Sequence, residues 1–342
     1  MNSDGSSDTI SRMEHTPIRV VIIGGGFFGS KRLEACLSLP NSFTVVAIVD
    51  PSEPQRAKIK EMYGLPTYKT LDDFPDLADL AIIATPNSFH ADASISALKK
   101  GMHILCEKPL STNTRDAKRI VRMAKKYKRL VKMGSNHRFF YSLMKAREEV
   151  EAGTIGKLLH FKGSIGSNGS RVSGKWFWNK ALSGGGTFID NGSHLVDIAR
   201  MFMGNFERVT ASMETNMWNS AGVEDMGTAI FRTQDGRQAI ISSSWYQWAG
   251  YLHIELWGDK GYIIIDSHEK DIVTIGDISG GSTVYDYSEK KRDSYQRELM
   301  YVAACIKKNE QPSPNAEDGK EVIALIESAY KAANRKRWTH VS

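Results

Sequence analysis

Cysteine is scarce in this sequence: 342 residues contain three, Cys36, Cys106 and Cys305. They lie far apart and form neither a C-x-x-C pair nor any spacing typical of metal ligands. Such sparing use of cysteine is typical of a reducing compartment, where thiols stay reduced. We therefore expect a cytoplasmic protein that has neither disulfides nor a metal site.

Long hydrophobic runs are also missing. No stretch of about 18 apolar residues offers a membrane span. The first 16 residues are polar and rich in Ser and Asp, without the apolar core of a signal peptide. We expect no membrane partner, and we interpret residues 1–16 as a disordered lead.

Neither sign of charge is in large excess, because 45 Lys and Arg residues face 39 Asp and Glu residues, a net charge of +6. The basic residues are dispersed, and no basic run is interleaved with aromatic residues as a nucleic-acid surface requires. We expect no nucleic-acid partner. The small positive excess either favours phosphorylated substrates or keeps the protein in solution.

Strand and helix patterns alternate through the first third of the chain. The length of 342 residues suits two domains. Apolar, β-branched runs at 18–23, 43–49, 80–84, 103–106 and 130–133 alternate with helical patterns at 28–39, 55–63, 90–100 and 114–127. This alternation predicts a Rossmann domain over 17–138, a doubly wound parallel sheet with right-handed crossovers.

The pattern changes after residue 138. Asp-Gly and Asp-Lys-Gly turns join strand-like runs at 228–233 and 237–245, and at 252–257 and 262–266. Helical patterns at 294–308 and 319–333 close the chain. We predict a second α/β domain over 139–342, with an open sheet that is mainly antiparallel or mixed.

A glycine-rich loop follows the first predicted strand. Gly24, Gly26 and Gly29 form G-x-G-x-x-G between a strand and a helix, the context in which this pattern indicates a dinucleotide site. Gly24 permits the tight turn, Gly26 lets the backbone approach the pyrophosphate, and Gly29 allows close helix packing. Phe27 and Phe28 open the helix, whose N-terminus attracts the phosphates.

Asp50 ends the second predicted strand, 21 residues after Gly29. A carboxylate there accepts hydrogen bonds from the adenosine ribose and repels a 2′-phosphate, which favours NAD over NADP. Arg56 is the nearby cation that would counter this preference. The alternative is that Asp50 only caps the turn before Pro51.

Three longer motifs appear in order along the chain: residues 84–90 (ATPNSFH), 106–109 (CEKP) and 184–194 (GGGTFIDNGSH). Together they make the chain resemble the Gfo/Idh/MocA family from about residue 18 to the last helix. The resemblance implies a sugar, inositol or nucleotide-sugar oxidoreductase whose second domain binds substrate and often forms oligomers through its open sheet. We expect a homodimer or a homotetramer.

The resemblance also implies that Lys108 faces both nicotinamide and substrate. Independently of it, Lys108 closes a predicted parallel strand at its carboxyl end, where open α/β sheets bind ligands. An ammonium group there donates to the reacting hydroxyl and stabilises developing alkoxide charge.

Asp190 and His194 are four residues apart and share one face if a helix starts near Asp190. His194 would take the hydroxyl proton as hydride leaves the same carbon, although the sequence leaves open whether Lys108 does so. Asp190 either fixes the His194 tautomer or binds a sugar hydroxyl, and Asp197 is a competing partner for His194. The alternative is an N-cap aspartate and a packing histidine.

Further candidates follow strand ends or lie in loops. The resemblance places the loop at 85–90 along the cofactor, and a Gly/Ser-rich stretch before residue 184 suits substrate binding. We predict cofactor contacts from Thr85, Pro86, Asn87, His90, Glu107 and Asn136, and substrate contacts from Asn136, Arg171, Trp176 and Trp178. There is an alternative to each of these roles. His90 could only start a helix, and Trp176 and Trp178 could only pack between the domains.

These features predict reversible, NAD-dependent oxidation of a secondary hydroxyl on a sugar or cyclic polyol. A nucleotide-linked sugar or another diol or ketone, handled in a biosynthetic pathway, is an alternative substrate. The alternative from another functional class is a non-catalytic NAD-binding regulator. The combination of Lys108, Asp190 and His194 argues against it.

Overall fold

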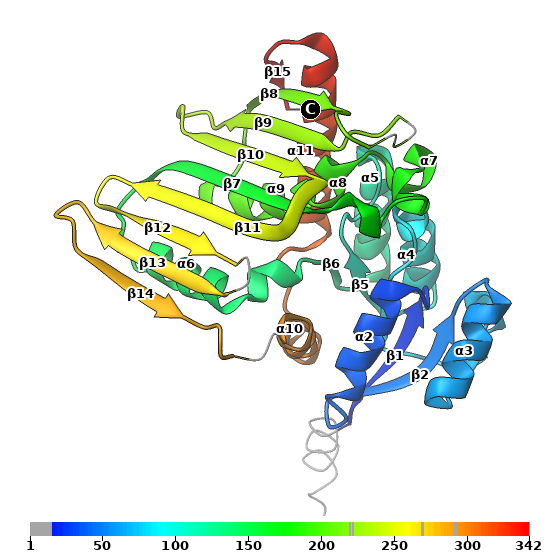
Figure 1. Ribbon diagram of the computed structural model, residues 1–342. Helices are drawn as coiled ribbons and strands as arrows, with labels where there is room; N and C mark the ends of the chain where they lie inside the picture. The colour runs from blue at the N-terminus through cyan, green and yellow to red at the C-terminus, as the bar shows by residue number, and fades with distance from the viewer. Residues whose placement is uncertain (1–15, 219, 221, 268–269, 291–292, 342) are drawn as a thin grey trace, which may run out of the picture. The chain divides into compact units, whose positions relative to one another are not determined.

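The computed structural model describes residues 16–218, 220, 222–267, 270–290 and 293–341 (Figure 1). The chain divides into two compact units that are not contiguous in sequence. Unit 1 comprises Met1–Glu107, Arg119–Gly134 and Tyr295–Ala316, and unit 2 comprises Lys108–Lys118, Ser135–Ser294 and Glu317–Ser342. The chain passes between the units more than once, and the expected domain bounds of 17–138 and 139–342 stay predictions. Nearly all of the expected lead lies outside the described residues.

Unit 1 contains the predicted parallel sheet, with the strand order β3-β2-β1-β4-β5-β6. Its strands are β1 (Ile18–Ile23), β2 (Phe43–Val49), β3 (Thr67–Tyr68), β4 (Leu80–Ile83), β5 (His103–Glu107) and β6 (Val131–Gly134). The order reverses between β1 and β4, where doubly wound sheets bind nucleotides at the strands' carboxyl ends. β3 was not predicted, because a strand of two residues shows no periodicity.

Helices accompany this sheet, as alternation along the chain requires. They are α2 (Phe27–Leu37), α3 (Glu53–Tyr63), α4 (His90–Lys99), α5 (Thr114–Tyr127) and α10 (Ser294–Lys308), with 3-10 turns η1 (Leu71–Asp73) and η2 (Asn87–Phe89). Every residue of β4 is buried, which explains why its sequence is a continuous apolar run rather than an alternating one. Residues of α10 lie in unit 1 although they come from far along the chain.

A network of four buried charges crosses unit 1. The Arg32 Nε on α2 donates to Glu107 at 2.6 Å, and its Nη1 forms an ion pair with Glu298 of α10 at 2.7 Å. Lys132 of β6 donates to the same Glu298 carboxylate at 2.7 Å. The ring of Tyr295 lies 4.5 Å from the Arg32 guanidinium carbon. Two cations and two anions therefore balance one another in the interior.

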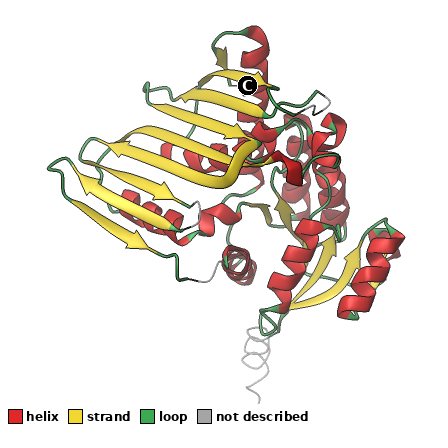
Figure 2. Ribbon diagram, in the orientation of Figure 1, coloured by secondary structure: helices red, strands yellow, loops and turns green. Residues whose placement is uncertain are grey.

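Unit 2 contains a nine-stranded mixed sheet in the order β14-β13-β12-β11-β7-β10-β9-β8-β15, in which β7 and β10 are parallel (Figure 2). The strands are β7 (Leu158–Asn168), β8 (Arg208–Glu214), β9 (Met226–Arg232), β10 (Gln238–Ser244), β11 (Tyr246–Gly258), β12 (Gly261–Asp266), β13 (Ile272–Asp277), β14 (Ser282–Asp286) and β15 (Thr339–His340). Both predicted hairpins are present, and the predicted fold class is confirmed.

The helices of unit 2 leave one face of this sheet uncovered among the described residues. The helices are α6 (Tyr141–Glu151), α7 (Lys180–Ser183), α8 (Thr187–Asp190), α9 (Gly192–Met203) and α11 (Ala316–Arg335), with 3-10 turns η3 (Asn136–Phe139), η4 (Gly169–Arg171) and η5 (Trp176–Trp178). α9 packs on β7 and β10, α8 packs on β9 and β10, and α6 packs on β12 and β13.

α11 begins at Ala316, earlier than the expected start at Gly319. Gly319 therefore lies inside the helix, where a Cβ atom would come within 2.8 Å of the Leu110 side chain. The glycine serves close packing rather than the start of the helix.

The buried network predicts a strong effect of Glu298→Gln. Burial alone would raise the pKa of Glu298, but the charges of Lys132 and Arg32 lower it to about 2. Loss of this anion leaves two cations under-compensated, so we expect a loss of about 3–5 kcal/mol in the free energy of unfolding at pH 7, measured by urea denaturation.

The difference from wild type should be complete above the ordinary Glu pKa of 4.5 and should shrink as the pH falls toward 2, because protonation then removes the same charge from wild type. The control is Glu151→Gln, which breaks the exposed Arg147–Glu151 ion pair and should cost less than about 1 kcal/mol. Equal effects of the two substitutions would contradict the role of the network.

Candidate active site

The loop between β1 and α2 takes its form from its glycines. Gly24 has a left-handed φ of 99°, and a Cβ on Gly29 would lie 1.9 Å from the Gly24 carbonyl oxygen. These two positions therefore exclude side chains. A Cβ on Gly26 would meet nothing within 4 Å, so the loop has an open face there. The structure thus leaves space where the sequence predicts the pyrophosphate.

The first turn of α2 follows this open face. Gly26 is its N-cap residue and has no side-chain cap hydrogen bond, and Phe27 beside it is 72% exposed. First-turn N–H groups of a helix have no partner within the helix and attract anions. The backbone here therefore suits a dinucleotide phosphate.

Asp50 holds the glycine loop. Its Oδ2 accepts from the Gly25 N–H and its Oδ1 from the Ser52 N–H, both at 2.8 Å. Arg56 donates through Nη1 to the carbonyl oxygens of Asp50 and Pro51 at 2.8 and 2.9 Å. Each carboxylate oxygen can accept a further bond from a ribose hydroxyl.

The loop after β4 is held by His90, the first residue of α4. The His90 side chain is buried, and its Nε2 lies 2.9 Å from the Thr85 carbonyl oxygen. Thr85 Oγ1 is buried and has no hydrogen-bond partner among the described residues. An unsatisfied hydroxyl beside the β4 end fits a bound cofactor. The cofactor roles of Thr85, Pro86, Asn87 and His90 stay predictions.

Two of the three expected catalytic residues are in direct contact within unit 2. Lys108 Nζ donates to the Asp190 carbonyl oxygen at 2.9 Å and to its Oδ1 at 3.0 Å. The side chains are 11% and 16% exposed. Folding therefore brings together residues that lie 82 positions apart. Partial shielding from water strengthens this charge pair relative to one on the surface.

His194 lies one turn beyond Asp190 and is buried, with 7% exposure. Its ring stacks on His137 with the centroids 3.7 Å apart. Burial, followed by the charges of His137 and Lys108, holds the pKa of His194 well below its ordinary value. At neutral pH the imidazole is therefore uncharged, the form that accepts a proton.

Neither expected carboxylate bonds to Nδ1 of His194. That atom is buried without a hydrogen-bond partner among the described residues. Asp197 instead accepts from Arg138 Nε and Nη2 at 2.7 and 2.6 Å, and from the Ser135 hydroxyl. Asp197 pairs with Arg138 and Asp190 with Lys108, and the role of either carboxylate toward His194 stays a prediction.

A buried carboxylate shapes the turn before α8. Glu224 accepts from the N–H groups of Gly186 at 2.8 Å and Phe188 at 2.9 Å, and from the Tyr330 hydroxyl at 2.7 Å. A Cβ on Gly186 would lie 1.8 Å from the Glu224 carbonyl oxygen. This explains why glycine is required there, since no side chain fits.

Glu224, Tyr330 and Arg138 support the site, and none of them was among the predicted site residues. Glu224 is 38 positions from Gly186, and no local pattern connects them. Arg138 is the one whose position in the sequence could have indicated a role in the site, because it follows Asn136 and His137 at the end of a predicted strand.

Other predicted residues have contacts of their own. Asn136 donates to the Ser294 hydroxyl at 3.1 Å, and Glu107 pairs with buried Arg32. Trp176 stacks on Phe177 at 4.0 Å, Trp178 lies 6.0 Å from Trp218, and Arg171 is exposed on η4. None of these contacts reaches Lys108, Asp190 or His194. Their binding roles stay predictions.

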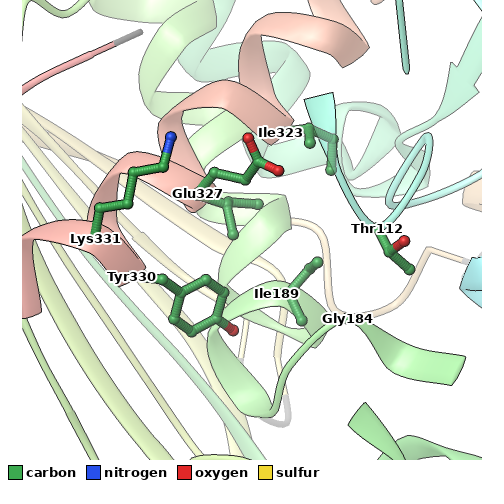
Figure 3. Close-up of a pocket in the computed structure, with 8 residues that line it drawn as sticks. Thr112, Gly184, Ile189, Ile323, Glu327, Tyr330 and Lys331 are labelled. Atoms are coloured by element: carbon green, nitrogen blue, oxygen red, sulfur yellow. The ribbon is translucent and has the colours of Figure 1, made fainter. Parts of the chain in front are cut away.

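A pocket of about 190 Å³ lies in unit 2, between α11 and the turn before α8. Figure 3 shows the residues that line it. It is lined by Thr112, Gly184, Ile189, Ile323, Ile326, Glu327, Tyr330 and Lys331. The Glu327 carboxylate already accepts from Thr114, through its N–H at 3.1 Å and its hydroxyl at 2.6 Å. The lining contains none of Lys108, Asp190 and His194, so this pocket is separate from their cluster.

The chain is similar to known oxidoreductases over both of its parts. Residues 18–135 match the model described as the oxidoreductase family, NAD-binding Rossmann fold, and residues 143–264 match the GFO/IDH/MocA C-terminal domain. Myo-inositol 2-dehydrogenase of Thermotoga maritima is 31% identical over 332 residues, covering 94% of this chain and 97% of the relative. The chain belongs to the Gfo/Idh/MocA family.

Other members of the family are similar over most of their length. The scyllo-inositol 2-dehydrogenase (NAD(+)) of Bacillus subtilis is 26% identical, covering 88% of this chain and 89% of the relative. A levoglucosan dehydrogenase in complex with NADH has the same fold, with a TM-score of 0.88 at 21% identity, covering 96% of this chain and all of that one.

Membership confirms two predictions: the chain is an enzyme, an oxidoreductase, and its cofactor is NAD. When bound, NAD supplies C4 of the nicotinamide as hydride acceptor. Three features fit the cofactor: the open loop face at Gly26, the Asp50 carboxylate and the buried Thr85 hydroxyl.

No helix among the described residues is long and apolar enough to cross a membrane.

The contacts of Asp50 predict cofactor discrimination. Asp50→Asn keeps an oxygen for the Gly25 N–H but removes the charge that opposes a 2′-phosphate. We expect the ratio of the Kd values of NADP and NAD to fall at least about tenfold, which is about 1.4 kcal/mol, measured by calorimetry. Asp50→Ala should in addition weaken both cofactors, because the loop loses its anchor. An unchanged ratio in Asp50→Asn would mean that Asp50 only caps the loop.

Proposed function

We propose that this enzyme oxidises a secondary hydroxyl of a cyclic polyol or sugar to the ketone, reversibly and with NAD as hydride acceptor. One observation carries the proposal: a lysine paired with an aspartate lies in the same unit as a buried, uncharged histidine. The inositol and levoglucosan dehydrogenases that the chain is similar to support this substrate class.

Lys108 and His194 have complementary roles in the proposed reaction. His194 accepts the proton of the substrate hydroxyl, since its imidazole is uncharged. Lys108 donates a hydrogen bond to the same oxygen and stabilises the charge that develops on it. The C–H electron pair leaves the carbon as hydride, and the O–H electron pair becomes the second bond of the carbonyl. In reduction the imidazolium returns the proton.

Asp190 orients Lys108 in this mechanism. Its carbonyl oxygen and Oδ1 both accept from Nζ, so two of the three ammonium protons are fixed and the third is free to donate to substrate. The second Asp190 oxygen can accept from a neighbouring hydroxyl. A vicinal diol, as in inositols and sugars, would use both groups.

The experiment is a panel of inositols, sugars and sugar phosphates incubated with NAD, followed by the absorbance of NADH. We expect turnover with at least one cyclic polyol or sugar. Lys108→Met and His194→Gln should each lower kcat at least about a hundredfold, because each removes a group that acts in the transition state. The Kd of NAD should change less than about threefold.

The matched control is Lys157→Met at an exposed lysine, which should keep wild-type kinetics. Binding of NAD without turnover of any compound in either direction would contradict the proposal and favour a regulator. Turnover only in the direction of a ketone reduction would instead favour a biosynthetic reductase.

We also propose that the uncovered face of the unit 2 sheet joins subunits into a homodimer or homotetramer. One row in register across this face runs through Thr210, Ile230, Ile240, Lys162, Glu255, Ile264 and Thr274. It combines half-buried isoleucines with a Lys162–Glu255 ion pair at 2.8 Å. A mixed apolar and charged row suits an isologous contact, in which the same surface meets itself.

Light scattering coupled to size exclusion tests this assembly. We expect a mass of at least twice the 38.1 kDa of one chain. Ile240→Glu should reduce that mass, because it places a charge at the contact. The control Ile278→Glu, at a residue with 81% exposure, should leave it unchanged. A wild-type mass of one chain would contradict the assembly.

We also propose that the enzyme is cytoplasmic, because its three cysteines are buried thiols that form no disulfide. Recovery from a secreted or membrane fraction would contradict this.

A further inference from the structure

His137 is the residue in closest ring contact with His194. The two imidazoles stack with centroids 3.7 Å apart and an interplanar angle of 18°. Phe140 lies near His137 as well, with the ring centroids 4.6 Å apart. His137 therefore contacts both the expected proton acceptor and a fixed aromatic ring.

The segment that carries His137 is clamped to α9. Ser135 and Arg138, on either side of it, both donate to the Asp197 carboxylate, and Asp197 is 1% exposed. Asp197 lies on the same helix as His194. The clamp thus fixes the stacked pair, because both rings are attached to elements that the Asp197 contacts hold together.

Stacking replaces a hydrogen bond that usually orients such a histidine. A catalytic imidazole commonly donates its second N–H to a carboxylate or carbonyl, but His194 Nδ1 has no such partner among the described residues. The carboxylates close by are committed elsewhere, Asp190 to Lys108 and Asp197 to Arg138. Among the described residues, the face of the His137 ring lies against the His194 ring instead.

We propose that His137 is a positioning residue for the oxidation: its stacked ring sets the orientation of His194 and, as a second imidazole 3.7 Å away, opposes a positive charge on His194. This rests on the proposed function.

Two stacked imidazoles this close repel one another when both are protonated. The ionisable groups around His194 are the imidazole of His137, the ion pair of Lys108 with Asp190, and the ion pair of Arg138 with Asp197. Burial comes first among the causes that lower the pKa of His194, and the charge of His137 comes second.

Two variants separate the two parts of the proposal. His137→Phe keeps an aromatic face but carries no charge, so kcat should stay within about threefold of wild type. Because the neighbouring charge is gone, the pKa of His194 should rise. Oxidation needs uncharged His194, so the acid limb of kcat/KM should move to higher pH.

His137→Ala removes the face as well. The His194 ring can then rotate out of its reactive geometry, and kcat should fall at least about tenfold while KM changes less than about threefold. Unchanged NAD affinity and circular dichroism would show that the variant is folded. The control His340→Phe, at an exposed histidine, should leave both kcat and the pH profile unchanged.

Histidine NMR on the labelled enzyme gives a readout that does not depend on turnover. The His194 titration should lie at lower pH in wild type than in His137→Phe, and the histidine peaks should show coupled titration. Identical His194 titrations would overturn the charge effect, and wild-type kcat in His137→Ala would overturn the positioning effect. An enzyme that turned over no substrate would contradict the proposed function. The NMR titration would still show whether His137 affects the pKa of His194.

Discussion

The buried charge network of Arg32, Glu107, Lys132 and Glu298 is the constraint from which the rest of unit 1 follows. Four ionised groups removed from water are tolerable only when each faces an opposite charge at close range. That condition fixes α2, the end of β5, the start of β6 and α10 relative to one another. It also explains why α10 belongs to unit 1 rather than to the sequence that surrounds it.

Two of these anchored strands lead directly into residues of the proposed site. Lys108 follows Glu107 at the end of β5, and Ser135 to Arg138 follow Gly134 at the end of β6. A strand that is held in place restricts the backbone positions of the residues that follow it. The network therefore holds the backbone immediately before Lys108 and shortly before His137, the kind of support that active-site residues in general require.

In unit 2, two buried carboxylates hold segments of the chain in place. Glu224 binds the backbone of the glycine turn before α8, and Asp197 binds Arg138 and Ser135. Each saturates its oxygens with donors, as buried anions must. Glu224 thus holds the backbone of the glycine turn, and Asp197 holds the side chains of Ser135 and Arg138, on either side of His137. The same burial that protects the site also keeps His194 uncharged.

Periodicity and local backbone demands were sufficient to predict the alternating strands and helices, the glycine loop with Asp50, and the bounds of α5 and α10. These features depend on neighbouring residues, so the order of amino acids alone contains them. Resemblance to a family supplied Lys108, Asp190 and His194. The sequence did not predict the pairing of Arg32 with Glu298, the hold of Glu224 on Gly186, or the stacking of His137 on His194. Such contacts join residues that no local pattern relates, and they exist only once the folded chain has excluded water and left each buried group a single partner within reach.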